Sequence, residues 1–295
     1  MSPLPLSYPS PLYLPFNAEA LAGRLQPQAA DADPGGEGFW LLLRGNELAL
    51  VAGDDGFALP QGAVPEPLAD LAAGPLYLGL WDGRPCRALS LPRERELPPG
   101  LQVENLMASE PRINIDLLSL AGRAGQMLHW EQNSRICSRC GGSTEGLPGE
   151  SGKKCLSCGY HHFPHIHPCV IVLIHRAGEV LLARKAEWPQ GRYGLVAGFL
   201  DCGECFEEAV TREIAEETGL RVRDIRYLGS QCWPFPSQVM AGFAAAWEGG
   251  EVAVDHKELE DARWFALDAL PQLPPRRSIA RYLIDHWLAQ QGNRG

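Results

Sequence analysis

The chain has 295 residues, a length that suggests about two domains. Hydrophobic residues make up 45% and charged residues 21%, which is the balance of a globular protein rather than of a disordered or fibrous one. The formal net charge of −10 excludes proteins that bind nucleic acid through a general positive field.

Three features of membrane and secreted proteins are missing from the sequence, and their absence indicates the cellular compartment. The longest apolar run, Cys169–Ile174, is too short to span a membrane. No Lys or Arg precedes Arg24, so the first residues do not have the basic start of a secretory signal. Nine cysteines are an odd number at modest density, which argues against a disulfide scaffold. We therefore predict a protein of the reducing cytoplasm.

Residues 1–130 are predicted to form an N-terminal α+β domain. Short strands are expected at 39–43, 47–51, 76–80 and 86–91, the first two joined as a hairpin. A helix is expected from Asp116 to about Gln132, because Leu117, Ala121, Ala124 and Leu128 fall on one helical face. The segment contains no motif that indicates a function, and no long-period repeat is visible in the chain.

The residue composition and pattern change after Asn133, and two further domains are predicted. Residues 131–165 contain two cysteine pairs, and residues 166–295 mix strand and helix patterns. Strands are expected at 169–175, 179–183, 225–229, 239–247 and 262–265. One helix is expected from about Cys205 to Thr218, ending at Gly219, and another at 278–290 with Ser278 as N-cap.

The cysteine pairs predict a structural zinc site. Cys137 and Cys140 are separated by two residues, as are Cys155 and Cys158, and 14 residues lie between the pairs. Each pair can place two thiolates on a tight turn, and four thiolates complete a tetrahedral zinc site. Reactive dithiols or disulfides are the alternative. A nearby group of histidines is interpreted as surface or satisfied side chains rather than as a second metal site: His161, His162, His165 and His167.

An acidic helix follows the loop that begins at Gly198. On a helical wheel its apolar stripe runs into three carboxylates within one turn. The stripe consists of Phe206, Ala209, Val210, Glu213, Glu216 and Glu217. Unpaired acids on a core-facing stripe would repel each other and lose hydration, and a hard divalent cation removes both costs. Arg212 could hold one acid by a bidentate pair.

Three glutamates alone would be interpreted as a solvated helix face, but the whole pattern is more specific. It matches the Nudix signature G-x5-E-x7-R-E-U-x-E-E-x-G-U, with U apolar, at every fixed position. The matching residues are Gly198, Glu204, Arg212, Glu213, Ile214, Glu216, Glu217, Gly219 and Leu220. The chain thus resembles the Nudix hydrolases, which cleave a nucleoside diphosphate linked to another group. The resemblance implies an α/β/α sandwich with a mixed sheet for residues 166–295.

A second motif narrows the resemblance. Residues 230–238 read SQCWPFPSQ, in which two aromatic rings and two prolines could form a rigid wall for stacking on a base. Core packing near a turn is the alternative. The stretch is similar to the SQPWPFPxS motif of the NADH pyrophosphatase branch of the Nudix hydrolases, which also carries a four-cysteine zinc ribbon before the Nudix domain. The likeness covers about residues 110–295.

The resemblance implies roles for individual residues. Catalytic Mg²⁺ or Mn²⁺ is expected on Glu213, Glu217, the later Glu258 and the backbone carbonyl of Ala197, with Glu216 as a candidate to order or deprotonate water. Substrate contacts are expected at Arg112, Glu150, Phe163, Gln231, Cys232, Trp233, Pro234, Phe235, Pro236, Ser237, Gln238 and Ala280.

The sequence departs from the branch at several of these positions. Cys232 stands where the motif has Pro, Gln238 where it has Ser, and Phe163 where Tyr is frequent. Cys202 and Cys205 form a third C-x2-C pair within the loop of the signature. These are interpreted as free thiols, with sensitivity to oxidation or soft metals as the alternative.

The implied activity is hydrolysis of the pyrophosphate bond of NAD(H) to NMN(H) and AMP, and removal of NAD caps from RNA 5′ ends, by a homodimer. The basic residues of the ribbon, Arg135, Arg139, Lys153 and Lys154, offer a small patch for a phosphate chain. Two alternatives stay open. One is a Nudix pyrophosphatase for another nucleotide such as ADP-ribose. The other is a non-catalytic sensor of nucleotides or nucleic acid, disfavoured because every signature acid is intact.

Overall fold

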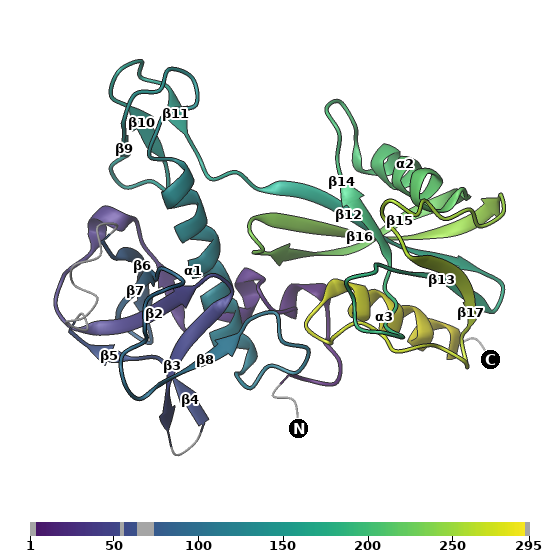
Figure 1. Ribbon diagram of the computed structural model, residues 1–295, viewed down its shortest axis with the longest axis horizontal. Coiled ribbons are helices and arrows are strands. Elements are labelled where there is room, and N and C mark those ends of the chain that lie inside the picture. The colour runs from purple at the N-terminus through teal and green to yellow at the C-terminus, as the bar shows by residue number, and fades with distance from the viewer. Residues whose placement is uncertain (1–3, 54–55, 64–73, 293–295) are drawn as a thin grey trace. The chain divides into compact units, whose positions relative to one another are not determined.

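A computed structural model of the chain describes residues 4–53, 56–63 and 74–292 (Figure 1). The chain divides into two compact units. The first comprises Ala18–Ile166 together with Trp233–Ser237, and the second comprises Leu4–Asn17, His167–Cys232 and Gln238 onward. Residues 4–17 therefore belong to the second unit, although they precede the first in sequence. Among the described residues, no helix combines the length and the apolar character that crossing a membrane requires.

The first unit is built on an eight-stranded sheet. Its central strands run in the order β6, β7, β2 and β3, and β2 and β7 are parallel. The strands are β1 (Leu25–Pro27), β2 (Gly38–Arg44), β3 (Glu47–Gly53), β4 (Gly56–Ala58), β5 (Gln61–Gly62), β6 (Leu76–Trp81), β7 (Arg84–Ser90) and β8 (Leu101–Asn105). Short 3-10 turns lie at Pro11–Tyr13, Ala18–Leu21 and Ala30–Ala32.

The helix α1 (Ile115–Asn133) follows β8 and confirms the predicted amphipathic face. The four apolar residues expected on that face, Leu117, Ala121, Ala124 and Leu128, are all buried. The helix begins at Asn114, whose side chain accepts a hydrogen bond from the backbone N–H of Leu117, as an N-cap residue does. After α1 the chain forms a small three-stranded sheet from β9 (Thr144–Gly146), β10 (Lys153–Cys155) and β11 (His161–His162).

The second unit is a mixed sheet in the order β15, β16, β12, β13 and β17, with β14 paired to β12. The strands are β12 (His167–Arg176), β13 (Glu179–Arg184), β14 (Val196–Phe199), β15 (Arg221–Trp233), β16 (Gln238–Gly249) and β17 (Asp261–Ala266), and the helices are α2 (Phe206–Thr218) and α3 (Ile279–Gly292). The parallel pair β12 and β16 lies at the centre, and β12 is antiparallel to β13 and β14.

The predicted α/β/α sandwich is confirmed by the packing on the two faces of β12. Val170 and Val172 pack in one core with Val210 and Ile214 of α2. The alternate residues Ile171 and Leu173 pack in a second core with α3, through Leu283 and Ile284. A strand that is buried on both faces reads as a continuous apolar run, which is why residues 169–174 are apolar throughout.

The two units repeat one sheet topology, which the sequence did not reveal. In each unit a hairpin, β2–β3 or β12–β13, has its first strand parallel to a later strand, β7 or β16. In each, a short strand pairs antiparallel with the start of the hairpin, β5 or β14. A last strand, β8 or β17, pairs with the second hairpin strand, and a helix follows it. The repeat lies in backbone pairing and not in residue types, so a search for recurring residues misses it.

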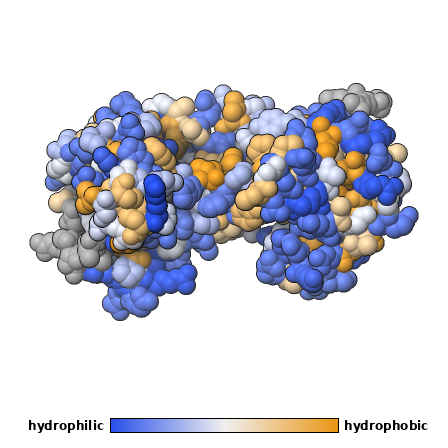
Figure 2. Space-filling model, turned by 90° about the horizontal axis from the view of Figure 1, so that it is seen from above, coloured by the Kyte–Doolittle hydropathy of each residue, from blue (hydrophilic) through white to orange (hydrophobic). Residues whose placement is uncertain are grey.

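The surface has the usual mixture of residue types. Figure 2 shows hydrophilic and hydrophobic residues interspersed on the face that it draws. Such a mixture is expected, because more than half of the accessible surface of a folded protein comes from apolar atoms.

Candidate functional site

The start of the acidic signature is a close contact between a strand and a helix. Gly198 lies on β14, which pairs with the first half of β12. A Cβ atom built on Gly198 would lie 2.0 Å from the carboxyl group of Glu213 on α2. Glycine thus leaves the Glu213 carboxylate in its place, which any side chain at this position would have to displace.

This contact makes a prediction for the variant Gly198→Ala. The added methyl must displace the Glu213 carboxylate, and a misplacement of about 1 Å in a catalytic group costs on the order of 10²-fold in rate. We expect such a loss in kcat, with weaker apparent affinity for Mg²⁺ and an unchanged unfolding midpoint. The matched control is Gly146→Ala, because no described atom lies within 4 Å of a Cβ at that position and its φ is not positive. Full activity of Gly198→Ala would contradict the assignment of Glu213.

Arg212 joins the loop before α2 to the acids of the helix. Its guanidinium donates to both carboxylate oxygens of Glu204, at 2.6 and 2.8 Å, and to the backbone oxygen of Phe199 at 2.9 Å. It also donates to Glu213 at 2.8 Å and Glu216 at 3.0 Å. The bidentate partner is therefore Glu204, and these bonds, with the backbone N–H of Asp201, lower the pKa of Glu204 to about 2.

Glu217 is the most unusual acid of the site. Its side chain is 2% exposed, and neither carboxylate oxygen has a hydrogen-bond partner. Burial raises the pKa of Glu217 to about 7, and the charges of Glu213 and Glu258 act in the same direction, whereas Lys185 opposes them. Burial likewise raises the pKa of Glu213, against the effect of Arg212. An unpaired buried carboxylate is costly unless a cation binds it.

The segment between β16 and β17 brings Glu258 close to Glu213 and Glu217. The backbone N–H of Asp255 donates to the carbonyl of Glu217, and that of Ala253 donates to the carbonyl of Thr218. These bonds hold the segment that carries Glu258 against the end of α2. The Glu217 carboxylate and its two acidic neighbours form the donor set that Mg²⁺ and Mn²⁺ prefer, so the residues fit a divalent cation.

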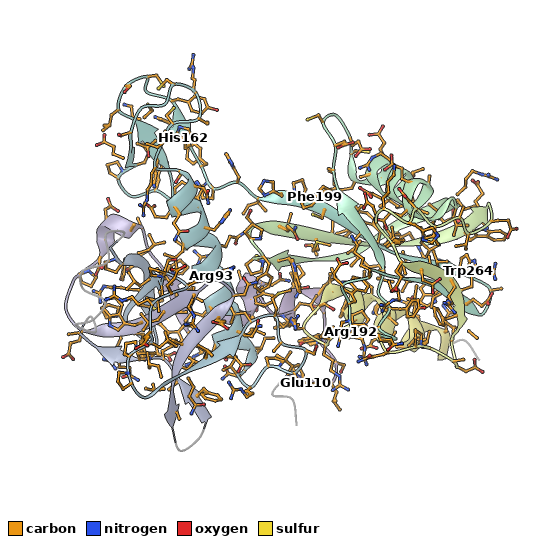
Figure 3. All side chains as sticks on the ribbon, viewed as in Figure 1. Arg93, Glu110, His162, Arg192, Phe199 and Trp264 are labelled. Carbon is orange, nitrogen blue, oxygen red and sulfur yellow. The ribbon has the colours of Figure 1, made fainter. Side chains whose placement is uncertain are left out.

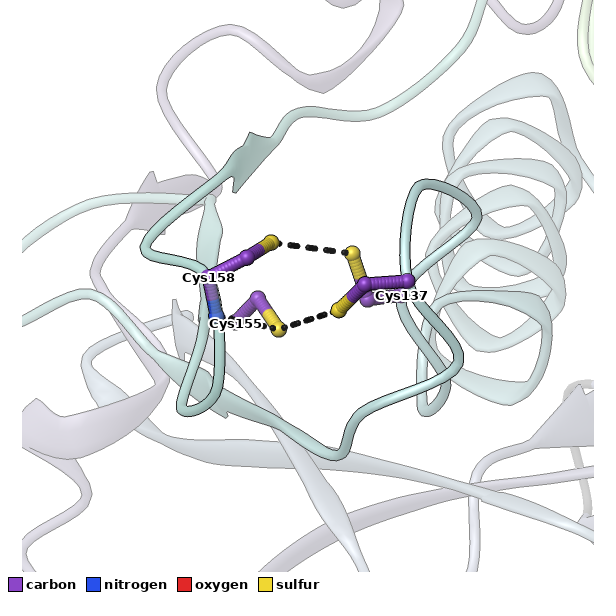
Figure 4. A group of neighbouring side chains, drawn as sticks. Cys137, Cys155 and Cys158 are labelled. Atoms are coloured by element: carbon purple, nitrogen blue, oxygen red, sulfur yellow. Dashed lines mark hydrogen bonds between the residues drawn. The ribbon is translucent and has the colours of Figure 1, made fainter.

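The zinc prediction is supported by the geometry of the four cysteines (Figure 4). Their sulfur atoms all lie within 4.8 Å of one another, with Cys137 and Cys158 at 3.8 Å and Cys140 and Cys155 at 3.5 Å. Tetrahedral zinc with bonds of about 2.3 Å requires sulfur separations of about 3.8 Å. Within the described ranges, no other group of His, Cys, Asp or Glu residues meets this distance, including the four nearby histidines and the Nudix acids.

The two cysteine turns share one construction. The backbone N–H of Gly141 donates to the carbonyl of Cys137, and that of Gly159 donates to the carbonyl of Cys155. Both glycines have positive φ, 76° and 71°, which lets the chain turn sharply after the second cysteine of each pair. The sequence C-x2-C-G, which occurs twice, is therefore the local signal for this site.

The aromatic motif forms the turn between β15 and β16. The rings of Trp233 and Phe235 meet edge to face with centroids 5.2 Å apart. Gln231 is fully buried in the second unit, where its side chain donates to the carbonyls of Pro15 and Arg277 and accepts from the N–H of Ile279. Among the expected substrate residues, Gln231 thus braces the end of β15 against the start of α3, where Ala280 is buried.

Three other expected substrate residues belong to the first unit. Arg112 is half exposed and pairs with the buried Glu104 at 2.7 Å. Phe163 is also half exposed. Glu150 is exposed and lines a cavity of about 490 Å³ between α1 and the small sheet. Nearby, the buried Lys153 pairs with Glu131 at 2.7 Å.

Sequence reasoning missed three residues that border the acids. Lys185 follows β13 and acts on the charge of Glu217. Cys169 is buried on β12, and burial together with the charge of Glu213 raises the pKa of its thiol to about 11. Phe199, labelled in Figure 3, follows Gly198 and is 51% exposed. The signature leaves the position of Phe199 free, but an aromatic residue directly after the first glycine of the signature was the available signal.

Three family models match consecutive parts of the chain. A NADH pyrophosphatase-like rudimentary NUDIX domain matches residues 37–130, a NADH pyrophosphatase zinc ribbon domain matches 132–163, and a NUDIX domain matches 165–287. The rudimentary domain coincides with the first sheet and α1, which agrees with the topology that the two units share.

Curated relatives match nearly the full chain. A Pseudomonas aeruginosa protein named NAD-capped RNA hydrolase NudC is 38% identical over 271 residues, which is 92% of this chain and 96% of the relative. The protein of the same name from Stutzerimonas stutzeri is 38% identical and covers 90% and 95% of the two chains. A solved NUDIX hydrolase from Nitrosomonas europaea is 27% identical over 46% of this chain and 80% of its own, with a TM-score of 0.41.

Proposed function

Because the chain belongs to the NADH pyrophosphatase branch of the Nudix hydrolases, we propose that it cleaves the pyrophosphate bond of NAD(H) to NMN(H) and AMP and removes NAD caps from RNA 5′ ends. The observation that carries this proposal is Glu217, a buried carboxylate without a hydrogen-bond partner, at its place in a complete Nudix signature. Burial of a carboxylate without a partner destabilises the fold, and a bound cation offsets this cost in a catalytic chain.

The acids are proposed to hold Mg²⁺ or Mn²⁺. The ligands would be the carboxylates of Glu213, Glu217 and Glu258 and the backbone carbonyl of Ala197, which lies beside Gly198 on β14. When bound, the cation neutralises phosphate charge and lowers the pKa of a bound water. Arg212 keeps Glu213 and Glu216 in place through hydrogen bonds of 2.8 and 3.0 Å.

Glu216 is proposed to orient and deprotonate the attacking water. Its carboxylate is 60% exposed and lies one turn from Glu213. The water oxygen forms a bond to one phosphorus atom in line with the bridging oxygen, the bond from phosphorus to the bridging oxygen breaks, and the water proton passes to the carboxylate. The two phosphates then leave as NMN(H) and AMP.

The aromatic turn is proposed to hold the base of the substrate. Trp233 and Phe235 present ring faces and edges, and the prolines on either side of Phe235 restrict the backbone. The remaining contacts proposed for the substrate are Arg112, Glu150, Phe163, Gln231, Cys232, Ser237, Gln238 and Ala280.

We also propose the finer organisation of the protein. The domain boundaries are placed at 1–130, 131–165 and 166–295, and the working form is a homodimer, as the family resemblance implies. The cysteines support a cytoplasmic location, because none of the nine forms a disulfide, including the exposed Cys202 and Cys205.

The test is a competition among three dinucleotide substrates. The purified protein, with Mg²⁺ or Mn²⁺, is given equal amounts of NADH, NAD⁺ and ADP-ribose, and the products are separated by chromatography. We expect NMNH and AMP first, and release of NMN from NAD-capped RNA in a second assay. Formation of ribose 5-phosphate and AMP from ADP-ribose, with NADH untouched, would instead mean that the substitutions at Cys232, Gln238 and Phe163 have changed the substrate specificity from NADH to ADP-ribose. Binding without turnover of any substrate would favour the sensor.

A further inference from the structure

The shared topology lets positions of the first unit be matched to positions of the second. The hairpin pair Arg44–Glu47 corresponds to Arg176–Glu179. Counting back along β2 and β12, the pair Gly38–Gly62 corresponds to Val170–Gly198, and Phe39–Gln61 corresponds to Ile171–Ala197. Gly62 is therefore the counterpart of the first signature glycine, and Gln61 is the counterpart of Ala197.

The first unit lacks the hydrolytic acids at this place. No described atom lies within 4 Å of a Cβ built on Gly62, whereas the Glu213 carboxyl fills that space at Gly198. The thirteen residues from Ala63 to Pro75, which link β5 to β6, contain two acids and no Arg-Glu-x2-Glu-Glu pattern. A ligand held here would therefore not be cleaved by the proposed mechanism.

A cavity of about 290 Å³ nevertheless lies at the matching position. It is lined by Phe39 at the start of β2, Gln61 on β5, Trp81 at the end of β6, and Asn114 and Leu117 at the start of α1. The corresponding elements of the second unit carry residues proposed for the cation or the substrate: Ala197 on β14 for the cation, and Gln231 near the end of β15 and Ala280 at the start of α3 for the substrate. The cavity of the first unit thus lies beside the elements that correspond to those of the proposed site in the second unit.

The lining indicates the class of ligand. Two aromatic rings of the lining are each covered by a guanidinium: Arg24 lies 4.2 Å from the centre of the Trp81 ring, and Arg84 lies 5.0 Å from the centre of the Phe39 ring. A planar guanidinium can stack on a flat heterocycle with its outer face. The amide oxygen of Gln61 accepts from Arg84 and that of Asn114 caps α1, so it is their amide N–H groups that can donate to ring edges. Arg24 is already paired with Asp82 and Asp116, so the cavity does not favour a phosphate group.

We propose that this cavity binds a nucleoside, a flat heterocycle on a ribose, without cleaving it. The volume lies just below the roughly 300–1,000 Å³ of pockets for drug-sized ligands, which suits one nucleoside rather than a dinucleotide. The match to the second unit rests on the proposed function, but the occupancy of this cavity does not depend on hydrolysis. Adenosine and nicotinamide riboside are the two sources of such a group in the proposed substrate.

The test is photolabelling with azidoadenosine, followed by peptide mapping of the intact chain. Expected is labelling of peptides that contain residues 57–61 or 114–117, reduced by an excess of unlabelled adenosine. If nicotinamide riboside competes better, the nicotinamide half is the source. Labelling confined to peptides of residues 167–292 would overturn the proposal, whether or not the protein hydrolyses NADH.

Two variants sharpen the result. Ala58→Trp adds a large side chain at an exposed position in the lining and should weaken the apparent affinity of adenosine for the first unit on the order of tenfold. Ala52→Trp is the matched control, because Ala52 is exposed on the neighbouring β3 and outside the lining. Gln61→Ala provides a second test without added bulk and should also reduce labelling. Equal labelling of all three variants would sink the assignment.

Discussion

Glu217→Gln is expected to abolish turnover and, without added Mg²⁺ or Mn²⁺, to make the protein more stable at pH 8. The loss of activity should be on the order of 10³-fold or more in kcat, because an amide is a much poorer ligand for a divalent cation and several kcal/mol of charge stabilisation are lost. Glu207→Gln is the matched control, since Glu207 is an exposed acid in the first turn of the same helix.

The stability change follows from the raised pKa of Glu217. An unfolded Glu titrates near 4.5 and the folded group at about 7, so between these values the folded state binds more protons than the unfolded state. The free energy of unfolding therefore falls as pH rises through this window, by about 3 kcal/mol in all. The glutamine variant avoids this loss.

Urea unfolding at pH 4.5 and pH 8 measures the effect. We expect wild type and Glu217→Gln to differ little at pH 4.5 and the variant to be more stable at pH 8. Added Mg²⁺ should stabilise wild type more than the variant. If wild type were as stable as the variant at pH 8, Glu217 would not be an uncompensated buried charge.

Cys155→Ser is expected to release the zinc ion and unfold residues 137–162. A structural zinc site contributes about 10–16 kcal/mol of binding free energy to the fold of a small domain, and this segment buries little apolar surface of its own. Cys155 is buried, and its sulfur accepts from the backbone N–H groups of Ser157 and Cys158 at 3.4 and 3.5 Å. Loss of this thiolate removes one ligand and the partner of two backbone donors.

Zinc content and hydrogen exchange check this result. Wild type should carry one zinc ion per chain, and Cys155→Ser much less. The amides of β9 and β10 should lose protection, while those of β12 at the centre of the second unit keep theirs. Cys202→Ser is the control, because Cys202 is exposed and lies outside the cysteine cluster. Stoichiometric zinc in Cys155→Ser would rule out a four-thiolate site.

The parts of the fold that could be predicted are those with a strong local signal. The helix α1 extends one residue beyond the predicted range at each end, and α2 ends at Thr218, followed as expected by Gly219, which has a positive φ of 72°. Ser278 was predicted as the N-cap of the last helix, and α3 begins one residue later. These features depend on residues that are close in sequence: apolar residues at a period of 3.6 form the buried face of a helix, and glycine occupies the position with positive φ after its end.

The parts that were missed depend on partners far away in the chain. Strand β14 is four residues long in a glycine-rich loop, and only its pairing with β12 makes it a strand. The pattern predicts this strand at 225–229, whereas β15 spans Arg221–Trp233, because its charged first residues are exposed and show no apolar alternation. The same holds for the site: the signature names Glu213 and Glu217, but not the neighbouring Lys185.

The repeated sheet separates architecture from chemistry. The first unit completes the strand order of the second although the linker in the place of the acidic helix lacks the signature. A sheet of this topology therefore assembles without the signature glutamates. In the second unit the buried glutamates destabilise the fold and are not needed for its architecture. A lineage could consequently lose hydrolysis by a few substitutions in one helix while keeping its shape, and fold similarity alone would then overstate how many such proteins are enzymes.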